Sequence, residues 1–170
     1  MTRPNFFIVG APKCGTTSMV EYLHVHPEVY VPREKDLYYF GEDLEMHRPD
    51  QAAYLEHFKG AGRAKWIGES SVQYLRSESA PGEIAAWCDD PRVLIMLRNP
   101  VDFLYSYQGQ LVYHMEEDIL DFEEAIRAQD DRRDGKRLPR DSRAPSKLQY
   151  FRIASFAEHV ERWYETLGRE

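Results

Sequence analysis

The sequence has few cysteines and no long apolar run. Its 170 residues include two cysteines, Cys14 and Cys88, which are too few for a disulfide framework and favour a reducing compartment. The N-terminal apolar stretch runs only from Phe6 to Val9, which is too short for a secretory signal or a membrane-spanning helix. We therefore expect a cytoplasmic protein without a membrane partner.

The sequence also has no excess of basic residues. Lysine and arginine together number 22 and aspartate and glutamate 29, so the formal net charge is -7 at pH 7. A general nucleic-acid-binding protein would carry a basic excess, so we expect no nucleic-acid partner. The six histidines show no metal-ligand spacing with acids or cysteines, and no metal is expected. No feature of the sequence indicates an oligomeric state.

Short apolar runs alternate with helical patterns along the chain. Strands are expected at 6–9, 28–32, 64–71 and 92–97, and helices at 17–24, within 41–64, at 80–88, at 100–115, after Asp121 and after Ser155. Because strands that alternate with helices form parallel sheets, the expected fold class is α/β with a central parallel sheet. Residues 130–147 are charged, contain proline and lack periodicity, so we expect a mobile surface loop there.

The stretch FFIVGAPKCGTTSM (6–19) predicts an anion-binding loop. Gly10 ends the first strand, and the next helix begins at Thr17, so backbone N–H groups and the helix dipole favour a negative ligand. Lys13 adds a cation. The spacing is similar to the loop G-x-x-x-x-G-K-[ST], but Thr16 stands where nucleoside-triphosphate enzymes keep their lysine. The alternative is a strand–turn–helix joint without a ligand.

The end of the fourth strand argues against a Mg²⁺-bound triphosphate. In enzymes that bind such ligands, an acidic residue at a strand end helps to hold the metal. Here the strand at 92–97 is followed by Arg98, and Asn99 is the expected N-cap of a helix that begins at Pro100.

Four segments together resemble one enzyme family. GAPKCGTTSM (10–19) resembles the 5′-phosphosulfate loop of sulfotransferases that use 3′-phosphoadenosine 5′-phosphosulfate (PAPS), and LIMLRNPVDFLYSYQGQ (94–110) resembles their 3′-phosphate-binding strand and helix. EKDLYYF (34–40) and GESSVQYL (68–75) resemble two blocks of the carbohydrate-type branch, which includes the Golgi heparan sulfate enzymes and bacterial relatives. The resemblance covers most of residues 5–165.

This resemblance implies a P-loop-type, three-layer α/β/α fold and transfer of a sulfuryl group from PAPS without a metal. The implied acceptor is a hydroxyl group of a small molecule or carbohydrate, with an amine less favoured. It also implies a single sulfotransferase-like domain over residues 1–170. Because the family's domains extend further and this chain stops on a capped helix, we expect the domain to be C-terminally incomplete.

The resemblance assigns two sets of residues to PAPS. The 5′-phosphosulfate set is the loop itself: Lys13, Cys14, Gly15, Thr16, Thr17 and Ser18. Lys13 is implied to contact the bridging oxygen and the 5′-phosphate. Arg98 and Ser106 are implied to bind the 3′-phosphate. Without the family, Arg98 would be an ordinary surface arginine at a strand end and Ser106 an ordinary helix serine.

Asp36 is the candidate general base by position in the family block. The family usually has glutamate there, and Tyr38 replaces a frequent histidine. Glu34 is a nearby alternative, and Glu69 is a second candidate for the base, or a structural or acceptor-binding residue. The heparan branch often has a lysine where this chain has Ser70. Without the family, Asp36 would be a solvated acid in a charged turn.

Three functions remain open from the sequence. A PAPS-dependent sulfotransferase is the leading hypothesis. The alternatives are a P-loop small-molecule kinase, which should require Mg²⁺, and a nucleotide-binding fragment without activity. Acceptor specificity is expected to lie in the variable segments 41–62 and 130–150.

Overall fold

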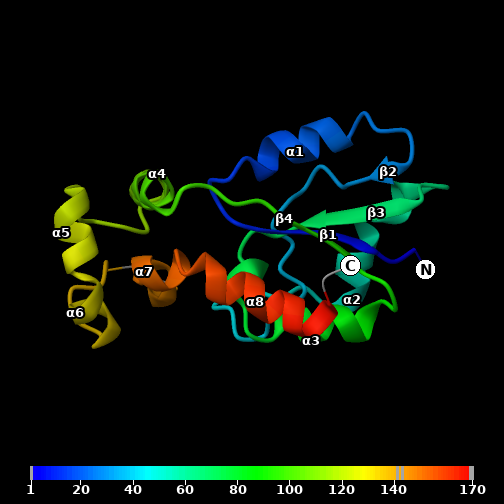
Figure 1. Cartoon of the computed structure of the whole chain (residues 1–170). Coiled ribbons are helices and arrows are strands. Elements are labelled where there is room, and N and C mark those ends of the chain that lie inside the picture. Colours follow the sequence, from blue (N-terminus) through cyan, green and yellow to red (C-terminus); the bar gives the residue numbers. More distant parts are fainter. Residues whose placement is uncertain (1, 141, 143, 169–170) are drawn as a thin grey trace. The chain divides into compact units, whose positions relative to one another are not determined.

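The computed structural model describes residues 2–140, 142 and 144–168, and its strands form one parallel sheet (Figure 1). The strands are β1 (Phe6–Gly10), β2 (Val29–Tyr30), β3 (Trp66–Ser70) and β4 (Arg92–Ile95), in the spatial order β2-β3-β1-β4. Each neighbouring pair is parallel. The α/β class with a central parallel sheet is confirmed.

The described residues also form helices and short 3-10 turns. The helices are α1 (Thr16–Leu23), α2 (Gln51–Glu56), α3 (Ala80–Trp87), α4 (Pro100–Tyr113), α5 (Phe122–Arg127), α6 (Gln129–Arg133), α7 (Tyr150–Ile153) and α8 (Phe156–Leu167), with 3-10 turns η1 (Lys59–Ala61), η2 (Tyr74–Arg76) and η3 (Pro145–Leu148). In Figure 1, α1 covers one face of the sheet, and α3 and α8 lie on the opposite side. This is the expected three-layer arrangement.

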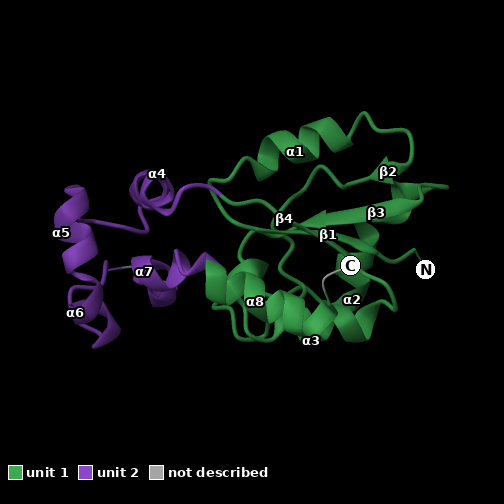
Figure 2. Ribbon diagram, viewed as in Figure 1, with its two compact units in different colours: residues 1–97, 157–170 green, residues 98–156 purple. Residues whose placement is uncertain are grey.

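The described chain divides into two compact units, coloured separately in Figure 2. Unit 1 comprises residues 1–97 and 157–170 and contains the sheet. Unit 2 comprises residues 98–156. The expectation of a single domain over residues 1–170 stays a prediction.

The central strand β1 builds a core on each face of the sheet. Phe7 and Ile8 are completely buried, and side chains alternate along a strand, so the two point to opposite faces. Ile8 packs with Val20 of α1 and with Val31. The Phe7 ring lies edge-on to Phe40, with ring centroids 5.8 Å apart. Residues on both sides of the sheet therefore pack against adjacent positions of one strand.

Two helix starts have the caps expected from the sequence. The Asn99 side chain accepts a hydrogen bond from the Val101 backbone N–H at 2.9 Å, and α4 begins at Pro100. The Asp121 side chain accepts from the Glu124 backbone N–H at 2.8 Å at the start of α5. These side chains satisfy N–H groups that have no partner within the first turn of a helix.

The expectation of a mobile surface loop over residues 130–147 is wrong for the two ends of the stretch, because residues 130–133 belong to α6 and residues 145–147 to η3. The Arg132 guanidinium is buried and donates to both carboxylate oxygens of Glu117, each at 2.5 Å. The Tyr150 hydroxyl donates to the same carboxylate at 2.6 Å. Burial alone would raise the pKa of Glu117, but the Arg132 and Tyr150 bonds outweigh it and lower that pKa.

We expect Arg132→Leu to lower the free energy of unfolding by about 3–5 kcal/mol, because it leaves the Glu117 carboxylate buried without its countercharge. Urea denaturation measures the change. Arg133→Leu is the matched control, since Arg133 is exposed and pairs with Asp130 at the surface. Such pairs contribute at most about 1 kcal/mol. Equal losses for the two variants would contradict a structural role for the buried pair.

Candidate active site

The loop between β1 and α1 has the backbone that its glycines predict. Gly10 has φ +143° and Gly15, the N-cap of α1, has φ +84°, a region that side chains disfavour. A Cβ atom at Gly10 would lie 2.6 Å from the Val72 carbonyl oxygen, so only glycine fits there. The expected strand, tight loop and helix N-terminus are therefore present.

The side chains of this loop face two environments. Lys13, Thr17 and Ser18 are exposed, Cys14 is half-buried, and Thr16 is buried. Lys13 has φ +59°, a conformation that costs a non-glycine residue about 1–3 kcal/mol and clusters at functional sites. The first turn of α1 contains no acidic residue. The exposed ammonium and hydroxyl groups thus stand at a helix N-terminus that favours an anion.

A second ammonium group contacts this loop. Lys35 Nζ donates to Thr17 Oγ1 at 2.8 Å. Lys35 is not among the site residues predicted from the sequence. Thr17 lies in the first turn of α1, whereas Lys35 lies beyond the other end of that helix. No local sequence pattern predicts a contact between them. The signal available was the position of Lys35 directly before Asp36 in the EKDLYYF block.

Asp36 is exposed and is tied to the end of β3. Its backbone N–H donates to the Ser70 carbonyl at 2.7 Å. Its carboxylate oxygen Oδ1 accepts from the Val72 N–H at 3.2 Å and from the Tyr38 hydroxyl at 3.1 Å. Lys35, the residue before Asp36, contacts Thr17 of the anion loop. The Asp36 carboxylate therefore lies in the same part of unit 1 as that loop. The alternative acid Glu34 instead lies 3.5 Å from the His57 ring, oxygen to Nδ1.

Glu69, the other candidate base, is in the opposite environment. It is 1% exposed. Its carboxylate accepts hydrogen bonds from the hydroxyls of Ser71 and Tyr74, each at 2.7 Å, and from the Tyr54 hydroxyl. Burial raises the pKa of Glu69, while the three hydroxyl bonds act in the opposite direction. The structure therefore offers one exposed and one enclosed carboxylate.

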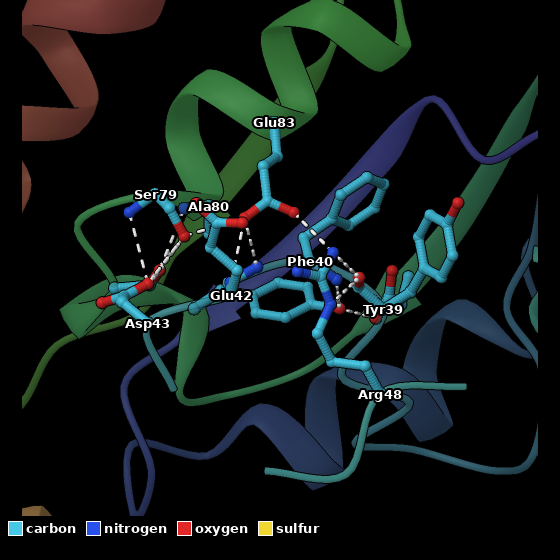
Figure 3. Close-up of polar contacts among 12 residues, drawn as sticks. Tyr39, Phe40, Glu42, Asp43, Arg48, Ser79, Ala80 and Glu83 are labelled. Atoms are coloured by element: carbon cyan, nitrogen blue, oxygen red, sulfur yellow. Dashed lines mark hydrogen bonds and ion pairs between the residues drawn. The ribbon is translucent and has the colours of Figure 1, made fainter. Parts of the chain in front are cut away.

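The segment that carries Asp36 continues to a second anchor at the start of α3 (Figure 3). The Glu83 carboxylate oxygen Oε1 accepts from the backbone N–H groups of Gly41 and Glu42, each at 3.0 Å. Arg48 donates to the other Glu83 oxygen at 2.7 Å and to the Tyr39 carbonyl at 2.7 Å. The Arg48–Glu83 ion pair thus holds the far end of the segment, at Gly41 and Glu42.

Asp43 extends this second anchor toward η2 (Figure 3). Its carboxylate accepts from the backbone N–H groups of Glu78 and Ser79 and from the hydroxyls of Ser77 and Ser79. Partial burial would raise the pKa of Asp43, but these bonds outweigh it and hold that pKa at about 2. Asp43 is therefore ionised in its folded environment at neutral pH.

Arg98 and Ser106 lie together in unit 2. Both line one open cavity of about 590 Å³ beside α4, whose other lining residues are Val101, Asp102, Tyr105, Gly109 and Phe122. Arg98 is exposed and Ser106 half-buried. A guanidinium and a hydroxyl on one cavity match the donors that a phosphate group needs.

Two kinds of feature are absent from the described residues. Residues 2–140, 142 and 144–168 contain no group of three or more histidine, cysteine, aspartate or glutamate side chains that could hold a metal ion. Within the same ranges, no helix is both long enough and apolar enough to cross a membrane.

Comparison with known proteins decides the family. The sulfotransferase domain family matches residues 3–170. This chain belongs to the sulfotransferase domain family. The crystal structure of a sulfotransferase from Alicyclobacillus acidocaldarius superposes with a TM-score of 0.85 and 32% sequence identity, covering 99% of this chain and 71% of that one. The P-loop-type α/β fold expected from the sequence is thereby confirmed.

Curated sulfotransferases from animals are also similar. The bifunctional heparan sulfate N-deacetylase/N-sulfotransferase 3 of Homo sapiens is 27% identical over 168 residues, which cover 94% of this chain and 18% of that protein. Carbohydrate sulfotransferase 15 of Rattus norvegicus is 30% identical over 148 residues, covering 61% of this chain and 26% of that protein. The chain thus spans only 18% to 26% of the length of these two relatives. The resemblance to the carbohydrate and heparan sulfate branch is confirmed.

Proposed function

We propose that this chain transfers a sulfuryl group from PAPS to a hydroxyl group of a small-molecule or carbohydrate acceptor, with an amine as the less favoured acceptor. The observation that carries the proposal is the cavity shared by Arg98 and Ser106. It offers a second anion site in addition to the loop of unit 1. PAPS carries two separate anions, a 5′-phosphosulfate and a 3′-phosphate.

In this proposal the loop of unit 1 binds the 5′ end of the donor. The backbone from Cys14 to Ser18 and the hydroxyls of Thr16, Thr17 and Ser18 supply donors, and Lys13 supplies charge. Lys35, which contacts Thr17 at 2.8 Å, adds a second ammonium group. Arg98 and Ser106 bind the 3′-phosphate.

The proposed reaction is a direct transfer. The acceptor oxygen forms a bond to sulfur as the bond between sulfur and the bridging oxygen breaks. The electron pair of that bond stays on the 5′-phosphate of adenosine 3′,5′-bisphosphate, where Lys13 and backbone N–H groups neutralise the developing charge. Asp36 accepts the acceptor proton, because its carboxylate is exposed and a base must reach the attacking oxygen. Glu69 stays the second candidate for this role.

Two other functions are kept as alternatives. A P-loop small-molecule kinase would bind ATP with Mg²⁺ and should have an acid after β4, where this chain has Arg98. A nucleotide-binding fragment would bind the donor without turnover. The cytoplasmic location expected from the sequence likewise stays a prediction.

Titration calorimetry with adenosine 3′,5′-bisphosphate and with ATP and Mg²⁺ tests the donor. We expect the bisphosphate to bind more tightly, and Arg98→Ala to weaken it far more than adenosine 5′-phosphate, because charge-assisted bonds to the 3′-phosphate are lost. Arg127→Ala is the matched control, since Arg127 is exposed in the same unit and pairs with Glu123. Tighter binding of ATP with Mg²⁺, or equal losses for both adenosine nucleotides, would contradict the assignment.

We expect Lys13→Ala to keep the fold and to lower the rate of transfer from PAPS by about 10²–10³-fold. Removing one group that stabilises the developing charge costs about 3–4 kcal/mol in the transition state. Steady-state assays of sulfated product measure the rate. Lys59→Ala is the control, because Lys59 is exposed and pairs with Glu56 at the surface. Wild-type turnover by Lys13→Ala would remove this residue from the mechanism.

We expect Asp36→Asn to lower kcat by roughly 10²–10⁴-fold with PAPS affinity nearly unchanged, because removal of a general base has that effect. Asp36→Glu should keep appreciable activity. The comparison variant is Glu34→Gln, whose carboxylate contacts His57 instead. Loss of the rate in Glu34→Gln, together with an active Asp36→Asn, would move the role to Glu34.

A further inference from the structure

Glu69 is a completely enclosed carboxylate that the proposed reaction does not need. We infer that Glu69 is a positioning residue: its carboxylate orients the hydroxyls of Ser71 and Tyr74, and these hydroxyls hold the backbone that carries Asp36. The inference rests on the proposed function for the role of Asp36. The arrangement of hydrogen bonds supports it independently.

A hydroxyl group can donate one hydrogen bond and accept another at the same time. A serine or tyrosine hydroxyl has one hydrogen to donate and lone pairs to accept with. Ser71 and Tyr74 each donate that hydrogen to Glu69 at 2.7 Å, so their lone pairs are left for other donors. The Tyr38 backbone N–H donates to the Ser71 hydroxyl at 3.2 Å, and the Phe40 N–H donates to the Tyr74 hydroxyl at 3.1 Å. Glu69 therefore fixes two acceptors for the same segment.

These hydrogen bonds hold the turn that carries Asp36. The residue has φ +60° and Tyr38 has φ +49°, conformations that non-glycine residues seldom adopt. Such conformations persist where the surroundings determine the backbone strongly. The Asp36 N–H is bound by the Ser70 carbonyl at 2.7 Å, and the Tyr38 N–H by the Ser71 hydroxyl. A hydroxyl turned away from Tyr38 would release one of the bonds that hold this turn.

Glu69 itself is badly placed to take the proton. It is 1% exposed, and both of its oxygens accept from hydroxyl groups of Tyr54, Ser71 and Tyr74. A general base must come within about 3.2 Å of the proton that it abstracts, or reach it through one water. Asp36 is exposed and meets that condition more readily.

Two substitutions of Glu69 separate positioning from base catalysis. In Glu69→Gln the amide oxygen can still accept from Ser71 and Tyr74, and the NH₂ group can donate to the Tyr54 oxygen. Removal of a general base lowers kcat by at least roughly 10²-fold. We expect Glu69→Gln to lower kcat by less than that. Glu69→Leu accepts no hydrogen bond, and we expect it to lose about 10²-fold in kcat, as misplacement of a reacting group does. Binding of adenosine 3′,5′-bisphosphate should stay unchanged in both.

Single hydroxyl deletions test the same path without touching Glu69. We expect Ser71→Ala and Tyr74→Phe each to lower kcat about fivefold, the value of one hydrogen bond, without weakening adenosine 3′,5′-bisphosphate. Tyr30→Phe is the matched control, because the Tyr30 hydroxyl donates to the His57 carbonyl at 2.8 Å and not to Glu69. Amide hydrogen exchange should show faster exchange at Tyr38 in Ser71→Ala and at Phe40 in Tyr74→Phe, with both amides unchanged in Tyr30→Phe.

The exchange measurement keeps this inference separate from the proposed function. If the unsubstituted chain transfers no sulfuryl group but the two amides lose protection in the variants as expected, the positioning path stands and the proposed reaction fails. If Glu69→Gln loses as much kcat as Glu69→Leu while Asp36→Asn stays active, Glu69 is the base and the inference is overturned. Unchanged exchange at Tyr38 in Ser71→Ala, or unchanged kcat in Glu69→Leu, would also overturn it.

Discussion

Backbone N–H groups that leave a sheet must still find acceptors, and the segment from Asp36 to Glu42 depends on side chains for them. Ser71, Tyr74 and Glu83 accept from four of its N–H groups, and the Ser70 carbonyl accepts from a fifth, that of Asp36. Each side-chain acceptor must itself be oriented. Glu69 orients the two hydroxyls, and Arg48 pairs with the Glu83 carboxylate. An irregular segment thereby acquires a defined backbone, and the carboxylate that it carries acquires a defined place.

The parallel sheet decides which segments meet at this place. The carboxyl ends of parallel strands lie at one edge, and ligands of open α/β sheets bind beyond that edge. The anion loop follows β1, and Ser71 directly follows β3, the neighbour of β1. The Ser71 N–H donates to the Ile8 carbonyl at 3.2 Å, which joins the two strand ends. Lys35 then contacts Thr17 in the first turn of α1, and Asp36 contacts Ser70 at the end of β3.

The fold and the anion loop could be predicted because their signals are local. Short apolar runs, the glycines at 10 and 15 and the cap at Asn99 each act within a few residues of chain. The Lys35–Thr17 contact, the hydroxyl cage of Glu69 and the Arg132–Glu117 pair could not, because their partners come together only after folding. The charged stretch at 130–147 shows the difference best. Its composition is typical of a solvated loop, yet Arg132 is buried and pairs with Glu117, which lies outside the stretch.

Two carboxylates that the sequence makes candidates for one role, Asp36 and Glu69, have different surroundings in the fold. Asp36 and Glu69 were both candidates for the same proton, since residue type alone does not distinguish them. Enclosure by three hydroxyls saturates Glu69 and keeps it from solvent, whereas the Asp36 carboxylate accepts bonds through Oδ1 and is exposed. A buried acid that accepts bonds is well suited to hold its neighbours, and an exposed acid on a hydrogen-bonded backbone is suited to meet a substrate. Division of roles between the two follows from their surroundings, since both carry the same functional group.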